Sequence, residues 1–148
     1  GAGEASYVAT LHDTAERVGA RANVHWVGQV EGARKQELLE RAAVFVLPSF
    51  NENFGIAAVE ALAAGVPCVL SDGVAVATEV AAAGAGLVVR PEPDAVAGAI
   101  KGLLADVPQR ARMAMAARQL ARDRFSPAAL GERLQALYAV LARGRERV

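Results

Sequence analysis

The chain has 148 residues, of which 53% are hydrophobic, and its 16 lysines and arginines balance its 16 aspartates and glutamates. This length gives one domain or a piece of a larger protein, and it suffices to bury a real core. The neutral total argues against a dedicated nucleic-acid binder, which carries a clear basic excess. Arginine dominates residues 110–147, which we interpret as solvated helix faces, with an anionic partner or membrane surface as the alternative.

The chain has a single cysteine and two histidines. Cys68 lies in the apolar run 66–70 and is predicted to be a buried thiol rather than a nucleophile. No paired cysteines indicate a disulfide framework, and His12 and His25 are too isolated to suggest a metal site. No signal peptide or membrane-spanning run is recognised, so we expect a cytoplasmic protein. A peripheral membrane location of a full-length parent stays open.

Helices and apolar strands alternate through the first part of the chain. Helical spacing and apolar runs predict helices over residues 6–19, 34–41, 56–64 and 76–83, and strands at 23–27, 44–47, 66–70 and 87–89. Gly65, followed by Pro67, is a strong stop signal for the helix at 56–64. Strands that are apolar on both faces and alternate with helices imply a parallel sheet between helices.

The remainder of the chain is predicted to be helical. We expect Asp94 to cap a first helix, Pro108 to begin a second, and Ser126 with Pro127 to begin a third. One side of the third helix is apolar, at Leu130, Leu134, Leu137, Tyr138 and Leu141. We interpret that side as core packing or as a surface that meets another domain. The predicted fold class is α/β, a Rossmann-like parallel sheet flanked by helices with a helical C-terminal region.

Ligands of such sheets bind at the carboxyl ends of the strands. We therefore expect one edge of the sheet to carry the turns after Val27, Leu47, Leu70 and Val89. Glu52, Gly55 and Asp72 all follow strand ends on that edge.

The loop at residues 51–55 delivers the amino end of a helix to this edge. Free backbone amides near residues 54–57 suit phosphate oxygens, because they point out of the helix start. Gly55 lets the backbone approach a ligand closely, since it has no side chain. The sequence therefore predicts an anion site at the start of this helix.

Two carboxylates flank the same helix start. Glu52 precedes the helix and is placed to accept from sugar hydroxyls. Glu60 lies deeper and is placed to accept from both hydroxyls of a ribose, because a carboxylate offers two acceptor oxygens and no donor. The structural alternatives are a helix-capping Glu52 and a solvent-facing or internally paired Glu60. The spacing between the two glutamates is not specific by itself.

The segment PSFNENFGIAAVEALAAGVPCVLSD, residues 48–72, resembles the signature of group-1 retaining glycosyltransferases of the GT-B fold, which use nucleotide-sugar donors. The matching positions are Pro48, Ser49, Glu52, Phe54, Gly55, Glu60, Ala61, Gly65, Pro67 and Val69. Residues 24–28 resemble the strand before the nucleobase pocket, and residues 79–89 resemble a further family segment. Phe125 and Ser126 before a final helix are also typical, so the resemblance covers essentially the whole chain.

This resemblance implies the C-terminal, donor-binding domain of a carbohydrate-biosynthesis enzyme that moves a sugar to a hydroxyl acceptor. Glu52 would contact the transferred sugar as the catalytic residue, and Glu60 would bind the donor ribose. The sugar and diphosphate would meet the amides of Phe54, Gly55 and Ile56, and the base would be bordered by Val27 and Gly28. The donor is a nucleotide-diphosphate sugar, and no metal or other cofactor is expected.

Residues 1–148 are expected to form a single nucleotide-sugar-binding Rossmann-like domain, a fragment of a longer enzyme. By resemblance, the missing parts are the N-terminal acceptor domain, which is the partner of this domain, and the first part of the C-terminal domain. Residues 1–4 resemble a loop after the family's basic residues, which neutralise the leaving group. We therefore expect the isolated chain to be inactive or nearly so. An unpaired sheet edge is expected to favour a homodimer in concentrated solution.

Two departures leave other functions open. Residues 72–76 replace a glycine-rich turn found in many relatives, so no sugar contact is carried over there. The alternatives are a catalytically silent GT-B-like binding or assembly module, and a nucleotide-sugar epimerase or phosphorylase relative. The sequence indicates neither the sugar and nucleobase of the donor nor the acceptor.

Overall fold

The computed structural model describes residues 3–145, with side chains to residue 142, so the expected opening loop at 1–4 lies partly outside the described residues. The chain divides into two compact units, residues 1–37 and 38–148, and each is described by itself. The elements are α1 (Ala5–Arg17), the 3-10 helix η1 (Arg21–Asn23), α2 (Gly32–Glu40), β1 (Phe45–Leu47), α3 (Ile56–Ala64), β2 (Cys68–Ser71), α4 (Ala77–Ala82), β3 (Gly86–Val89), α5 (Pro93–Ala105), α6 (Val107–Leu120), the π-helix η2 (Ala121–Phe125) and α7 (Pro127–Arg145).

The first unit does not contain the strand expected at residues 23–27. The 3-10 helix η1 takes up the start of that segment, Val24 is extended, and none of the described residues pairs with it as a strand. A strand requires a neighbour for its backbone hydrogen bonds, and the described part of this unit offers helices and loops. The Trp26 ring instead packs on His12, with the ring centroids 4.4 Å apart.

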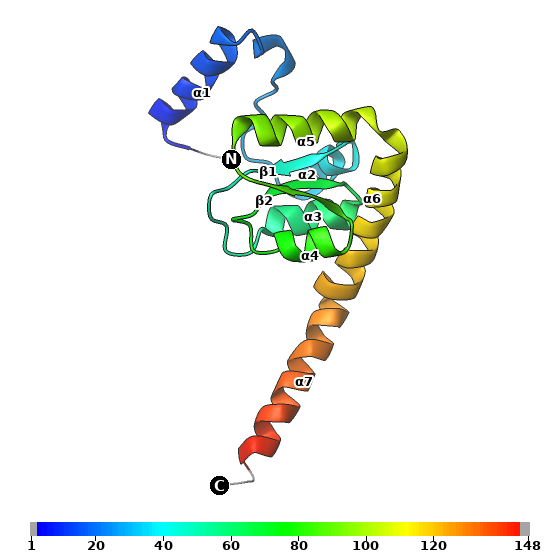
Figure 1. The fold of residues 1–148 in the computed structure, drawn as a ribbon. Coiled ribbons are helices and arrows are strands. Elements are labelled where there is room, and N and C mark those ends of the chain that lie inside the picture. The colour runs from blue at the N-terminus through cyan, green and yellow to red at the C-terminus, as the bar shows by residue number, and fades with distance from the viewer. Residues whose placement is uncertain (1–2, 146–148) are drawn as a thin grey trace. The chain divides into compact units, whose positions relative to one another are not determined.

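The second unit is built on a parallel sheet in the order β1-β2-β3 (Figure 1). Phe45 pairs with Cys68, and Cys68 pairs with Gly86 on the other side. A Cβ atom at residue 86 would lie 2.2 Å from the carbonyl oxygen of Cys68, so this pairing requires glycine. The strands predicted at 44–47, 66–70 and 87–89 and their parallel arrangement are confirmed, and β2 is the buried central strand.

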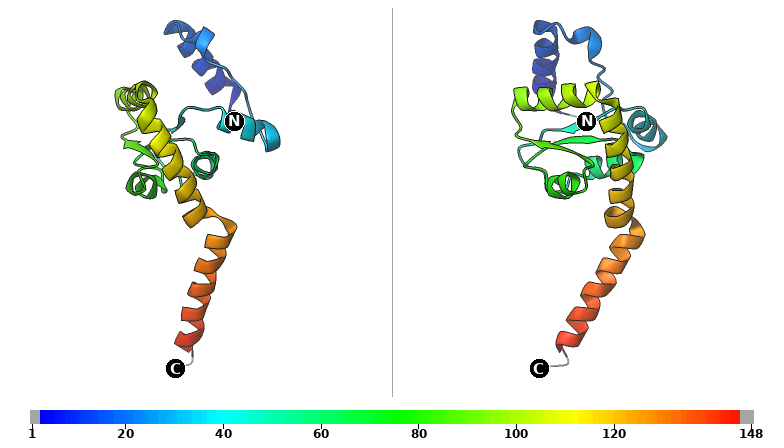
Figure 2. Two further views of the ribbon diagram at one scale, coloured as in Figure 1. Left: turned by 90° about the vertical axis from the view of Figure 1, so that its right-hand side faces the viewer. Right: turned by 45° about the vertical axis from the view of Figure 1, so that its right-hand side comes forward.

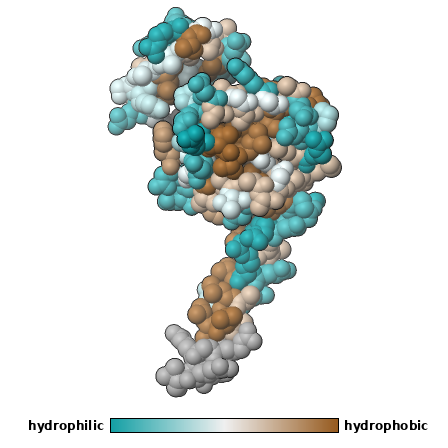
Figure 3. Space-filling view, viewed as in Figure 1, coloured by the Kyte–Doolittle hydropathy of each residue, from teal (hydrophilic) through white to brown (hydrophobic). Residues whose placement is uncertain are grey.

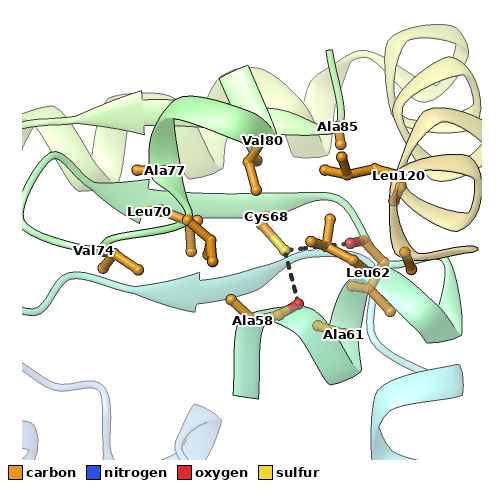
Figure 4. Packing of buried hydrophobic residues seen from close by; sticks show 14 residues of the cluster. Ala58, Ala61, Leu62, Cys68, Leu70, Val74, Ala77, Val80, Ala85 and Leu120 are labelled. Carbon is orange, nitrogen blue, oxygen red and sulfur yellow. Dashed lines mark hydrogen bonds between the residues drawn. The ribbon is translucent and has the colours of Figure 1, made fainter. Parts of the chain in front are cut away.

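Helices cover both faces of this sheet (Figures 1 and 2). α3 and α4 pack on one face, α5 packs on the other, and α6 contacts both α3 and α5. The main core lies under α3 and α4 (Figure 4), and its fully buried members include Ala58, Ala61, Leu62, Cys68, Leu70 and Val80. Because many of these side chains are small, the helices lie close to the strands.

The Cys68 thiol lies in this core (Figure 4), as predicted. Its Sγ atom is 3.5 Å from the carbonyl oxygen of Val66 and 3.9 Å from that of Ala58. Burial raises the pKa of Cys68 from 9.0 to about 12, because the thiolate would lose its hydration. The thiol is therefore protonated at neutral pH and suits packing rather than nucleophilic chemistry.

The C-terminal helices confirm most of the local signals. Ser126 caps α7, since its Oγ accepts a hydrogen bond of 3.1 Å from the Ala129 amide. The expected Asp94 cap is wrong, because α5 begins at Pro93 and Asp94 falls inside its first turn. A side-chain cap that was not predicted is Asp106 of α6, whose carboxylate accepts from the Gln109 amide at 2.7 Å.

The apolar side of α7 is exposed in the described chain. Brown apolar side chains mark the described part of this helix in Figure 3. The exposed fractions are Leu130 48%, Leu134 49%, Leu137 53%, Tyr138 67% and Leu141 57%. Core packing, one of the two interpretations of this side, is therefore wrong for these residues. The local amphipathic pattern is correct, but it does not specify what lies opposite.

Candidate functional site

The loops after β1 and β2 are joined backbone to backbone at the carboxyl end of the sheet. The Glu52 amide donates to the Gly73 carbonyl at 3.0 Å, and the Ala75 amide donates to the Glu52 carbonyl at 3.1 Å. A Cβ atom at residue 73 would lie 2.2 Å from the Phe50 carbonyl oxygen, so the loops meet without room for a side chain. The Ser71 hydroxyl donates to the Ser49 carbonyl in the same place. These contacts set the path of the loop that leads into α3.

Gly55 turns this loop into the helix. Its φ is +85°, a left-handed conformation that other residues rarely adopt. A Cβ atom there would lie 2.9 Å from Cγ1 of Val74, which belongs to the neighbouring loop. Glycine is thus required here by the turn itself, apart from any closeness to a ligand.

The first turn of α3 keeps free amide donors. The amides of Ala58 and Val59 both donate to the Gly55 carbonyl, at 2.9 and 3.1 Å. Within residues 3–145, the amides of Ile56 and Ala57 make no hydrogen bond. The side chain of Ile56 is 67% exposed. This helix start can therefore receive an anion, which the helix dipole also favours.

Glu52 lies directly before this helix start and is half-buried. Its Oε1 atom accepts a hydrogen bond of 3.3 Å from the Gly55 amide. This bond reaches the residue before the helix and none of its first-turn amides, so the side-chain cap that the sequence left open beside the sugar role is not formed. The carboxylate has further acceptor sites, since its second oxygen takes no part in this bond.

Glu60 lies one turn into α3 and is also half-buried. The buried face of the helix consists of Ala58, Ala61 and Leu62. With 3.6 residues per turn, Glu60 falls on the opposite face, next to Ile56 and Ala57. The structure therefore brings Glu60, Ile56 and the end of the Glu52 loop to one helix and one end of the sheet.

Asp72 and Phe54 complete this end of the second unit. Asp72 is exposed, and its amide donates to the Val89 carbonyl at 3.1 Å. Phe54 is 46% exposed, and its ring packs edge-on against Phe125, with centroids 6.0 Å apart. The sequence reasoning missed this contact, because nothing in the local pattern links residues so far apart.

Val27 and Gly28 belong to the first unit. Val27 is 43% exposed, and Gly28 has a φ of +65°. Together they line a hollow of about 370 Å³ whose other lining residues are Val8, Leu11, His12, His25 and Trp26. The role of both residues beside a nucleobase stays a prediction.

Among residues 3–145, no three His, Cys, Asp or Glu side chains are grouped closely enough to hold a metal ion. None of the helices in the described part of the chain has the length and apolar character required to cross a membrane.

Comparison with protein families identifies a match to glycosyl transferases group 1 over residues 2–120. The D-inositol 3-phosphate glycosyltransferase of Stackebrandtia nassauensis is 35% identical over 108 residues, which are 72% of this chain and 24% of that protein. The glycogen synthase of Mycobacterium tuberculosis is 32% identical over 144 residues, which are 97% of this chain and 35% of that protein.

Two solved structures share the fold. The sucrose-phosphate synthase of Thermosynechococcus elongatus has a TM-score of 0.83 and 26% identity, over 97% of this chain and 36% of that one. WaaG, a glycosyltransferase involved in lipopolysaccharide biosynthesis, has a TM-score of 0.68 and 28% identity, over 76% of this chain and 30% of that one. The chain thus spans about a quarter to a third of the length of these relatives.

Proposed function

The chain belongs to the group-1 glycosyl transferases, and from this premise we propose that it is the donor-binding part of a longer glycosyltransferase. That protein moves a sugar from a nucleotide-diphosphate sugar to a hydroxyl acceptor and retains the anomeric configuration. Its N-terminal acceptor domain is the partner of this part. The family match over residues 2–120 and the similarity to two named enzymes support the proposal. Because the chain spans only part of its relatives, we assign the transfer to the longer protein.

The start of α3 is the observation that carries this proposal. The unengaged amides of Ile56 and Ala57 offer donors to a diphosphate at the positive end of the helix dipole. We assign the amides of Phe54, Gly55 and Ile56 to the sugar and diphosphate of the donor, with the Gly55 amide exchanging its bond to Glu52 for one to the donor. No metal is needed in this proposal, because the amides and the dipole balance part of the phosphate charge.

The two glutamates have separate roles in the proposed site. Glu52, at the loop, accepts from hydroxyls of the transferred sugar and is the residue nearest the chemistry. Glu60, one turn into the helix, accepts from the ribose diol, because its carboxylate matches two hydroxyl donors. Val27 and Gly28 border the base. The isolated chain is proposed to transfer sugar poorly or not at all.

Calorimetric titration of the chain with UDP, GDP and ADP, in buffer containing EDTA, tests this proposal. We expect saturable binding of at least one nucleoside diphosphate. Glu60→Gln keeps the shape of the side chain but replaces one acceptor oxygen by a donor, so the affinity should fall at least about tenfold. Glu132→Gln, on the exposed surface of α7, is the matched control and should bind like the wild-type chain.

Failure of the wild-type chain to bind any of the three nucleotides would contradict the donor site. Equal affinities of Glu60→Gln and the wild type would contradict the ribose role alone. Product analysis with the full-length protein then separates the functions. Binding without turnover indicates a silent module, whereas robust transfer by the isolated chain contradicts its proposed inactivity.

A further inference from the structure

We propose that Phe125 is a positioning residue for the proposed donor site, so this inference rests on the proposed function. Phe125 is the last residue of the π-helix η2. Its ring meets Phe54 edge to face, at a centroid distance of 6.0 Å and an interplanar angle of 88°. Phe54 lies between Glu52 and Gly55 in the loop that leads into α3. The contact therefore joins the C-terminal helices to the site loop.

The loop is held firmly on one side only. Glu52 is tied to the loop after β2 by two backbone hydrogen bonds, and Gly55 packs against Val74. Asn53 and Phe54 lie between these two points and are both exposed. Within residues 3–145, the one ring-to-ring contact of Phe54 is with Phe125. The side chain of Phe54 thus depends on η2 for its aromatic packing.

Phe125 is itself well placed to act as an anchor. It is partly buried and packs against the main core, and Ala121 at the start of η2 is 7% exposed. The preceding helix α6 contributes Ala117 and Leu120 to the same core. A π-helix holds more residues per turn than an α-helix, so η2 changes the direction in which residue 125 projects. The ring is therefore fixed by the core on one side and meets Phe54 on the other.

Loss of the aromatic contact is expected to loosen the loop without unfolding the core. The amides near Phe54 and the carboxylate of Glu52 would then sample more positions. An edge-to-face aromatic pair accounts for about a threefold to tenfold change in an equilibrium constant. We expect a weakening of nucleoside diphosphate binding within that range.

The test compares three variants of the chain by two measurements. Phe125→Leu keeps an apolar anchor but removes the edge-to-face geometry, whereas Phe125→Tyr keeps the ring. Tyr138→Ala removes an aromatic side chain that is 67% exposed and serves as the control. The first measurement is amide hydrogen exchange of Gly55, relative to the core amide of Leu70. The second is calorimetric titration with the best-bound nucleoside diphosphate.

We expect faster relative exchange at Gly55 and about threefold to tenfold weaker binding in Phe125→Leu. Phe125→Tyr and Tyr138→Ala should resemble the wild type in both measurements. A Phe125→Leu variant with lower thermal stability but unchanged relative exchange and affinity would show a purely structural role and overturn the inference. If the wild-type chain binds no nucleoside diphosphate, the proposed function fails, and the exchange measurement still decides whether Phe125 positions the loop.

Discussion

A glycine flanks each end of α3, but the backbone groups at the two ends differ in their hydrogen bonding. Gly55 at the amino end and Gly65 at the carboxyl end are both buried and have φ values of +85° and +80°. At the carboxyl end, the carbonyls of Ala61, Leu62 and Ala64 are satisfied within the protein. At the amino end, the amides of Ile56 and Ala57 make no hydrogen bond within residues 3–145. One end is closed by contacts within the protein, and the other keeps amides without a partner in the described part of the chain.

The closed end combines a backbone motif with a side chain from α6. The amides of Gly65 and Val66 donate to the carbonyls of Leu62 and Ala61, both at 2.9 Å, which is a Schellman arrangement. Arg118 donates to the Ala64 carbonyl at 3.1 Å. Its positive charge also suits the negative end of the helix dipole. The contacts that cap this helix end therefore come from the protein itself and require no ligand.

The amino end shows that a helix start can be firmly positioned while its first amides have no hydrogen-bond partner among the described residues. Its position comes from the neighbouring loop, through Val74 and the backbone contacts of Glu52. Its amides are left for water or an anion. We therefore expect substitutions at the carboxyl end to change the free energy of unfolding alone. Substitutions at the amino end should also change ligand affinity.

Gly65→Ala should lower the free energy of unfolding strongly. Alanine resists the left-handed φ, and its Cβ atom would lie 2.3 Å from Cζ of Arg118, so the flexible arginine side chain would move away and lose its hydrogen bond to Ala64. We expect the free energy of unfolding to fall by about 2–3 kcal/mol in urea denaturation. The matched control is Gly102→Ala, in the last turn of α5 with no atom within 4 Å of its Cβ position. It should stabilise the chain by about 0.5–1 kcal/mol, and a similar loss in both variants would contradict the role of Gly65.

Gly55→Ala should affect both stability and binding. The same φ penalty applies, and the new Cβ would lie 2.9 Å from Val74. We expect a loss of about 2–3 kcal/mol in unfolding free energy, because the buried Val74 side chain has little room to move aside. Nucleoside diphosphate affinity should also fall clearly, because the helix start moves. Calorimetric titration compares the nucleoside diphosphate affinities of the two glycine variants. Equal loss of affinity in Gly65→Ala and Gly55→Ala would contradict the division of roles between the two ends.

Alkaline pH should destabilise the core beside α3. The Cys68 thiol lies near the carbonyls of Ala58, in the first turn of the helix, and of Val66, just after it, and its pKa is raised from 9.0 to about 12. The thiol of the unfolded chain loses its proton at a lower pH than the buried thiol of the folded chain. The contribution of Cys68 to the free energy of unfolding is therefore fully present below pH 9, and it falls as the pH rises towards 12. The slope attributable to this thiol is at most about 1.4 kcal/mol per pH unit.

Urea denaturation of the wild type and Cys68→Ala at several pH values isolates this effect. The variant is less stable at neutral pH because it leaves a small cavity. The difference between the two proteins should narrow above pH 9. A constant difference at all pH values would show that the thiol is not protected by the core.

Arg118→Ala should have the smallest effect. It removes one hydrogen bond to Ala64 and a favourable charge at the helix end, which together account for about 0.5–1 kcal/mol at an exposed position. Nucleoside diphosphate affinity should be unchanged, because the residue lies at the closed end. Arg118→Lys should recover part of the stability, since it keeps the charge. A loss of affinity in Arg118→Ala would show that the two ends are coupled.

The sequence predicted the elements whose signals are local. The helix Ile56–Ala64 has the expected bounds, because Gly65 and Pro67 end it. Ser126 caps α7 as its hydroxyl and the following proline indicate. The strand predicted at residues 23–27 is absent, because its formation depends on more than local signals. Its apolar pattern is correct for a strand, but a strand needs a partner that the pattern cannot supply.

The candidate site was predictable only in part. The glutamates and the glycine-led helix start follow from residue types and their order. The contacts of Glu52 with Gly73 and Ala75, and of Phe54 with Phe125, join segments that are separate in sequence. Local spacing carries no information about these contacts. The positions of Val27 and Gly28 relative to the site stay a prediction.

The sequence by itself determined the alternation of helices and strands, the family resemblance and the chemical groups at the start of α3. Only the tertiary structure decided that the two loops lock together, that Arg118 closes one end of α3, and that Phe125 meets Phe54. The physical reason is that periodicity and capping act over a few neighbouring residues. Packing, by contrast, depends on which distant surfaces meet when the chain buries its apolar side chains.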